Sequence, residues 1–143
     1  MSIEIEIKGH GGGIRITVLG YENPAANEPS DANWLVCRVN LGVGPFQGEM
    51  VATFATQDFA AFASELSALL QGETQRASFQ TDEQALDLQV EMAPRGAARI
   101  SGTARYSSGP DVRISFTLES DQTFLVPGVR ALETVLQDFP VRR

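Results

Sequence analysis

Alternation of hydrophobic and polar residues dominates the start of the chain. Ile3, Ile5 and Ile7 share one face of an extended segment, and charged residues occupy the positions between them. The same period of two returns at Ile14, after the glycine-rich stretch of residues 9–13. Because successive side chains of a strand point to opposite faces, the two segments predict half-buried strands joined by a hairpin turn.

The chain's single tryptophan and single cysteine lie in residues 31–43, DANWLVCRVNLGV, directly after a loop-like stretch with two prolines and two asparagines. Every second residue from Leu35 to Val43 is apolar, whereas the opposite face is apolar only at Trp34 and Val36. A strand near the centre of a sheet, covered by another element over its first half, gives this pattern. Residues 46–55 predict a fourth strand, with Phe46 on its apolar face.

The hydrophobic period lengthens over residues 56–72, TQDFAAFASELSALLQG. Phe59, Phe62 and Leu66 recur at the spacing of one helix face. We expect Thr56 to cap the start of this helix and Gly72 to end it. This segment closes the first half of the chain.

The second half repeats the order of elements. Four alternating segments predict strands, over residues 77–80, 85–93, 97–106 and 112–118. The apolar spacing over residues 127–139 predicts a second helix, which Pro140 ends.

The predicted architecture is an α+β fold: about eight mostly antiparallel strands with two helices packed on one side. We expect residues 1–143 to form a single domain. The halves 1–72 and 73–143 would each have the order ββββα, which raises the hypothesis of an ancient duplication. Chance agreement of two amphipathic helices explains the likeness of the halves equally well.

Composition narrows the functional classes. Of 143 residues, 43% are hydrophobic and 20% are charged, as in folded globular chains. No run approaches the roughly 18 apolar residues of a membrane helix, and the N-terminus lacks the apolar core of a signal peptide. With one cysteine and no internal disulfide, we expect a cytoplasmic protein. The formal charge of −7 disfavours nucleic acid as a ligand, since phosphate binding needs a basic patch.

Nucleophiles and soft metal ligands are scarce. Residues 10–13, HGGG, match the oxyanion-hole loop of esterases, but there is no G-x-S-x-G motif and His10 is the only histidine. A hairpin turn explains them better. Cys37 lies on the apolar face of a strand, where a thiol packs as a small hydrophobe. One histidine and one cysteine do not make a zinc site, so we expect no catalytic residue, metal or cofactor.

Carboxylates are the remaining candidates for catalysis. Asp87 and Glu91 lie on the polar face of one predicted strand, while Arg99, Arg105 and Arg113 lie on the strands that follow. Paired carboxylates catalyse hydrolysis when burial separates their pKa values. Carboxylates on the solvent-exposed face of a sheet more commonly form ion pairs with arginines on neighbouring strands, and we expect this role for Asp87 and Glu91.

Four short segments together resemble the WapI-like bacterial immunity proteins: DANWLV at 31–36, GPFQG at 44–48, DQTFLV at 121–126 and FPV at 139–141. Their order and spacing carry the resemblance, which extends from Ile3 to Val141. Members of this family are small cytoplasmic proteins encoded beside polymorphic toxins. The resemblance implies that the chain binds a cognate toxin domain and occludes it, without performing a reaction.

An acidic surface would suit a nuclease toxin, whose nucleic-acid cleft would be basic. Within the resemblance, the toxin-contact candidates are the residues in and beside the acidic loop: Glu22, Glu28, Asp31 and Trp34. Large aromatic residues flanked by polar groups are favoured at interfaces, although a tryptophan packed under a helix is equally ordinary.

The residues alone leave other functions open. A small-molecule-binding β-rich domain would show a closed apolar cavity between sheet and helices. A hydrolase would show Asp87 or Glu91 buried beside a second carboxylate. A structural or oligomer-forming module is a further alternative, and the sequence does not fix the oligomeric state.

Overall fold

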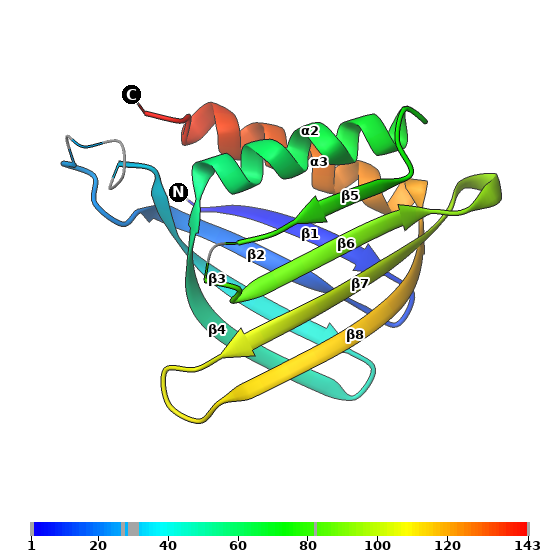
Figure 1. Ribbon diagram of the computed structural model, residues 1–143, viewed down its shortest axis with the longest axis horizontal. Helices are drawn as coiled ribbons and strands as arrows, with labels where there is room; N and C mark the ends of the chain where they lie inside the picture. Colours follow the sequence, from blue (N-terminus) through cyan, green and yellow to red (C-terminus); the bar gives the residue numbers. More distant parts are fainter. Residues whose placement is uncertain (1, 27, 29–31, 82, 143) are drawn as a thin grey trace.

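The computed structural model describes residues 2–26, 28, 32–81 and 83–142. Within these residues the fold is α+β, as predicted, with two four-stranded antiparallel sheets, two α-helices and a short 3-10 helix, η1 (Pro94–Gly96) (Figure 1). The first sheet contains, in spatial order, β1 (Ile3–Gly9), β2 (Gly12–Tyr21), β3 (Trp34–Val43) and β4 (Phe46–Ala55). The second contains β5 (Arg76–Phe79), β6 (Leu86–Met92), β7 (Ala97–Tyr106) and β8 (Val112–Asp121).

Each sheet is followed by one helix, so both halves have the predicted order ββββα. Helix α2 (Thr56–Leu70) follows β4, and helix α3 (Gln122–Asp138) follows β8. The helices then exchange sheets: α2 packs mainly along β5 of the second sheet, and α3 packs mainly along β1 of the first. The two helices contact each other and lie side by side along the edge strands β1 and β5 of the two sheets (Figure 1). Because each half covers the first strand of the other, the two halves share one hydrophobic core.

A cluster of four phenylalanines joins both sheets to α2 inside this core. Phe54 comes from β4, Phe59 and Phe62 come from α2, and Phe79 comes from β5; all four are at most 1% exposed. The Phe79 ring centroid lies 5.3 Å from those of Phe54 and Phe59, and 5.5 Å from that of Phe62. These separations are typical of favourable aromatic contacts.

The two sheets also meet directly where β1 ends and β8 ends. The His10 N–H donates to the Glu119 carbonyl at 2.7 Å, and the Ser120 hydroxyl donates to the Lys8 carbonyl at 2.7 Å. Gly9 lies between these bonds, and a Cβ atom there would be only 2.6 Å from the Glu119 carbonyl oxygen. The absence of a side chain at Gly9 therefore allows the two backbones to approach closely.

The helix termini correct two of our predictions. Thr56 is not the cap of α2: Ala55 is the N-cap residue, its N–H donates to the Asp58 carboxylate, and the buried Thr56 hydroxyl donates to the Asn33 carbonyl. The end of α2 was predicted correctly, since Gly72 has the positive φ of 79° that favours glycine after a helix.

Helix α3 begins five residues before the predicted start at Pro127, which lies inside the helix. Asp121 sets its start, because the carboxylate accepts the N–H groups of Thr123 at 2.8 Å and Phe124 at 3.2 Å. The hydrogen bond from the Thr123 hydroxyl, together with these two backbone bonds, lowers the pKa of Asp121. The sequence prediction placed the helix start at Pro127 and missed Asp121, which is a strong N-cap residue.

Candidate functional site

The loop between β2 and β3 contains most of the predicted contact residues. Glu22 is exposed, accepts a hydrogen bond from the Thr53 hydroxyl at 3.3 Å, and donates its N–H to the Trp34 carbonyl at 2.8 Å. Trp34 is half-buried at the start of β3, and Glu28 is exposed. Asp31 lies outside the described residues. The structure thus brings Glu22 beside Trp34 and leaves Glu28 accessible on the same loop.

Arg142, close to the C-terminal end of the chain, holds this loop. Its guanidinium donates to the carbonyls of Asn23 at 3.0 Å, Pro24 at 2.9 Å and Ala32 at 2.8 Å. The guanidinium also lies 3.8 Å from the centre of the Tyr21 ring, at cation–π distance. No local pattern in the sequence predicted this contact, because residues 118 or more positions apart form much of it.

Replacing Arg142 by alanine should loosen the loop. A hydrogen bond from a charged donor contributes about 1.5 kcal/mol or more, and loss of one such bond corresponds to about tenfold, so we expect amide exchange between residues 21 and 34 to rise at least tenfold. Hydrogen–deuterium exchange measures the effect. Arg142→Lys is the matched control, since it keeps the charge but loses the planar fork and should give a smaller rise. Exchange unchanged from wild type in Arg142→Ala would contradict this account of the loop.

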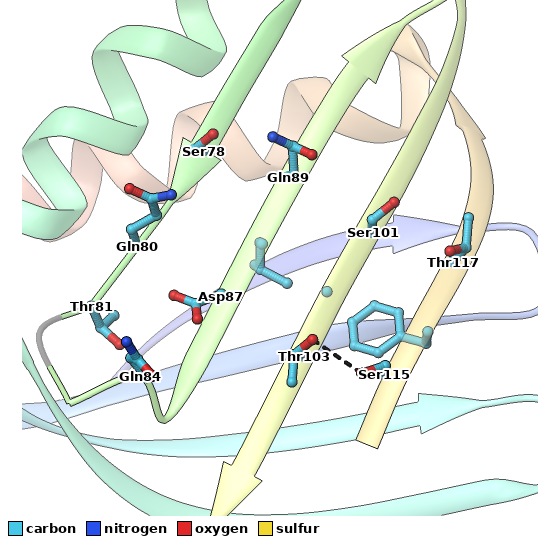
Figure 2. A pocket seen from close by; sticks show the side chains of 13 residues that line it. Ser78, Gln80, Thr81, Gln84, Asp87, Gln89, Ser101, Thr103, Ser115 and Thr117 are labelled. Atoms are coloured by element: carbon cyan, nitrogen blue, oxygen red, sulfur yellow. Dashed lines mark hydrogen bonds between the residues drawn. The ribbon is translucent and has the colours of Figure 1, made fainter. Parts of the chain in front are cut away.

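A second candidate surface is a hollow of about 1070 Å³ on the outer face of the second sheet. Figure 2 shows its polar side chains projecting from β5, β6, β7 and β8. Hydroxyl and amide groups dominate the lining, among them Ser78, Gln80, Gln89, Ser101, Thr103 and Thr117. Of the described residues that line the hollow, only Asp87 is charged.

Strand register places Asp87 in the interior of this polar face. It pairs with Thr103 on β7, and Thr103 pairs in turn with Ser115 on β8. The hydroxyls of Thr103 and Ser115 lie 3.1 Å apart and hydrogen-bond to each other. The half-buried Asp87 carboxylate makes no hydrogen bond or ion pair with another described residue.

The equivalent row of the first sheet has a different chemistry. The last strand of each sheet leads into a helix, so the residues six positions before the two helix caps, Glu49 and Ser115, correspond to each other. Following the strand pairing across each sheet from these two residues makes Arg15 of β2 the counterpart of Asp87 of β6. Arg15 is ion-paired to Glu6 at 2.9 Å, and this hydrogen bond raises the pKa of Arg15. At this position the first sheet therefore has an ion-paired arginine, whereas the second has a carboxylate lined by neutral groups.

Arginines do pair across the strands of the second sheet, as predicted, but with other partners. Glu91 pairs with Arg76 of β5 at 3.0 Å, Arg99 with Glu119 at 3.2 Å, and Arg105 with Asp111 at 3.7 Å. Asp87 lies across from a threonine instead. The sequence pattern predicted the polar face correctly. It did not predict that Asp87 lies opposite a threonine, because strand register decides which residues are paired.

The same geometry argues against carboxylate catalysis. Asp87 and Glu91 are four residues apart on β6, about 13 Å along a strand, whereas glycosidase carboxylates are about 5–9.5 Å apart. Glu91 is neutralised by Arg76. Among the described residues, no group of three or more His, Cys, Asp or Glu is placed to hold a metal ion.

Cys37 is fully buried on β3, and desolvation raises its pKa to about 12. Since only the thiolate attacks, we expect Cys37 to react with a disulfide reagent at pH 8 about a thousandfold more slowly in the native protein than in the unfolded chain. Absorbance at 412 nm with and without guanidinium chloride measures both rates. Rapid labelling of the native protein would show that the strand opens readily.

An apolar cleft of about 360 Å³ lies between the sheets, at residues including Val39, Met50, Tyr106 and Ile114. It is open to solvent, and it is not the closed cavity between sheet and helices that the small-molecule hypothesis required. Phe46, near this cleft on β4, is 68% exposed, so the prediction that it faces the core was wrong. The first four residues of β4 are all exposed, so the hydrophobic core does not extend to that end of the strand.

Comparisons with known proteins identify a family and a fold. The family model described as "Immunity protein WapI-like family" matches residues 4–140. No curated protein matches the sequence significantly.

Two solved structures share the fold. A structure of Trypanosoma brucei MRP1/MRP2 superposes with a TM-score of 0.50 at 11% identity, covering 99% of this chain and 88% of that one. A guide-RNA-binding protein complex bound to a guide RNA superposes with a TM-score of 0.52 at 13% identity, covering 96% and 91%. At such identities the likeness concerns the fold alone.

Proposed function

Because the chain belongs to the WapI-like immunity protein family, we propose that it protects the cell that makes it by binding a toxin domain in the cytoplasm and occluding it, without performing a reaction. The family match over residues 4–140 is the observation that carries this proposal. None of the described helices is long and apolar enough to cross a membrane.

The chemistry of the described residues supports a binding role. The thiol of Cys37 is buried with a raised pKa, so it stays protonated at neutral pH. The Asp87 and Glu91 carboxylates lie too far apart for paired acid–base hydrolysis. By contrast, the second sheet presents a broad face of hydrogen-bonding groups. Such a surface suits recognition of another molecule.

The charge of the chain favours a basic partner. The net charge of −7 would accelerate encounter with a toxin that has a positive nucleic-acid cleft. Glu22 and Glu28 are exposed on the loop that Arg142 holds, so in this proposal they steer association. Their effect should appear in the association rate and weaken as salt is raised.

RNA is a less suitable partner, although one structure of the same fold is a complex bound to a guide RNA. Binding of phosphates needs arginines and lysines that are available to them. On the sheet faces, Arg15, Arg38, Arg76 and Arg99 each lie within 3.2 Å of a glutamate oxygen. Lys8 and Arg113 are the exposed cations of these strands for which the described residues provide no ion pair. With these pairs and an overall negative charge, the chain fits a protein partner better.

Co-expression tests the proposal. The toxin domain encoded beside this chain's gene should arrest growth when expressed alone, and growth should recover when this chain is expressed with it. The two purified proteins should also co-elute as a complex. A toxin domain from an unrelated system is the control and should stay toxic. Failure of the chain to bind or neutralise the neighbouring toxin domain would refute the proposed function.

A further inference from the structure

We propose that the hollow around Asp87 is the surface on which the toxin docks, and that it receives a basic side chain of the toxin. The inference rests on the proposed function and assigns the site of contact. It is carried by the placement of one carboxylate, without an ion-pair partner among the described residues, at the centre of a neutral polar face.

The groups that surround Asp87 suit a cation. A lysine ammonium or an arginine guanidinium has several donors and no acceptor, so it needs oxygen atoms on several sides. The Asp87 carboxylate supplies the charge, and Gln80, Gln84 and Thr103 supply further oxygen acceptors around the same hollow (Figure 2). A bound cation would thus exchange water for several hydrogen bonds and one charge pair.

The composition of the outer face of the second sheet favours binding of another protein. Four strands about 4.8 Å apart span roughly 14 Å, which accommodates a basic side chain together with its neighbours. Charged side chains flank this neutral face on both sides. Two residues along the strands from Thr103 and Ser115 lie Arg105, which is ion-paired with Asp111 at 3.7 Å, and the exposed Arg113. In the other direction, four residues from Asp87, lies an internally paired row with Arg76, Glu91, Arg99 and Glu119. Interface centres are likewise depleted of charge and surrounded by a polar rim. Serine and threonine also lose little side-chain entropy when a partner fixes them.

The first sheet provides an internal comparison. Its equivalent row contains Glu6, Arg15 and Glu49, and Arg15 and Arg38 already pair with these glutamates. A basic partner would have to displace those arginines. We therefore assign the anchor to the second sheet and place the row of Glu6, Arg15 and Glu49 outside the contact.

Three variants test the assignment against the purified toxin domain. Asp87→Asn removes the charge, Asp87→Arg reverses it, and Ser101→Tyr fills the hollow with a side chain that strands accommodate well. The control is Glu49→Arg, which makes the same charge change in the equivalent row of the first sheet. Circular dichroism melting curves establish that each variant is folded, and surface plasmon resonance gives both rate constants.

We expect Asp87→Arg to weaken binding about 30-fold or more, chiefly through faster dissociation, because it places two like charges together at a desolvated contact. Ser101→Tyr should weaken binding by a similar factor, and Asp87→Asn by about tenfold. Glu49→Arg should stay within about threefold of wild type.

If the wild-type chain binds and folded Asp87→Arg and Ser101→Tyr both stay within threefold, the docking site is wrong while the proposed function stands. If the wild-type chain does not bind the toxin domain, the proposed function itself is wrong, and the inference falls with it. An equal loss in Glu49→Arg and Asp87→Arg would show a general charge effect and would also overturn the assignment.

Discussion

Replacing Phe79 by alanine should lower the free energy of unfolding by about 3–5 kcal/mol, the usual cost of deleting a buried aromatic ring. Phe79 is 1% exposed and contacts Phe54 of the first sheet as well as Phe59 and Phe62 of α2. Its removal would leave a cavity where both sheets and a helix meet. Because those elements hold one another in place, the site has little freedom to collapse around the cavity.

Urea unfolding followed by circular dichroism measures this change through the transition midpoint. Phe46→Ala is the matched control, since it deletes the same ring from a residue that is 68% exposed. It should change stability by less than about 1 kcal/mol. Equal losses for the two variants would show that the phenylalanine cluster is not the junction we describe.

Replacing Gly9 by valine should destabilise the fold by about 3 kcal/mol, at the upper end of the usual cost of overpacking. A Cβ atom at this position would lie 2.6 Å from the Glu119 carbonyl oxygen and 3.1 Å from the Leu118 Cβ. Both neighbours belong to β8, where the chain is held by bonds to His10 and Lys8. The clash would therefore separate the ends of β1 and β8 and weaken these hydrogen bonds.

Gly48→Val provides the control for this prediction. Gly48 lies in the edge strand β4, and no heavy atom lies within 4 Å of the position its Cβ would occupy. Valine favours strands, so this variant should be neutral or slightly stabilising. Unfolding curves of the two variants compare them directly. A Gly9→Val protein as stable as wild type would show that close approach at the seam is unimportant.

The elements of the fold were predictable because most of them have one apolar and one polar face. The alternation at Ile3, Ile5 and Ile7 predicts β1, and Phe59, Phe62 and Leu66 predict the buried face of α2. The exchange of helices between the sheets was not predictable from these periods. A helical spacing shows that a face is buried but not which strand covers it, and the exposed Phe46 illustrates the same limit.

The candidate site depends even more on contacts distant in sequence. The polar face that contains Asp87 was evident from alternation, and pairing of its carboxylates with arginines was expected. Register decides that Asp87 meets Thr103 while Glu91 meets Arg76 and Arg99, and one residue of slip would change every partner. The Arg142 contact with the loop likewise needs the whole fold to bring its partners together.

The central claim is that this chain neutralises a toxin by binding alone. Titrating a fixed amount of the toxin domain with increasing amounts of the chain, while following residual toxin activity over time, tests it most directly. We predict inhibition that is complete at a fixed molar ratio, does not grow with longer incubation, and is reversed when the two intact proteins are separated under denaturing conditions and the toxin is refolded. Inactivation of excess toxin by a small fraction of the chain, progressing with time and leaving a covalently altered toxin, would contradict the claim.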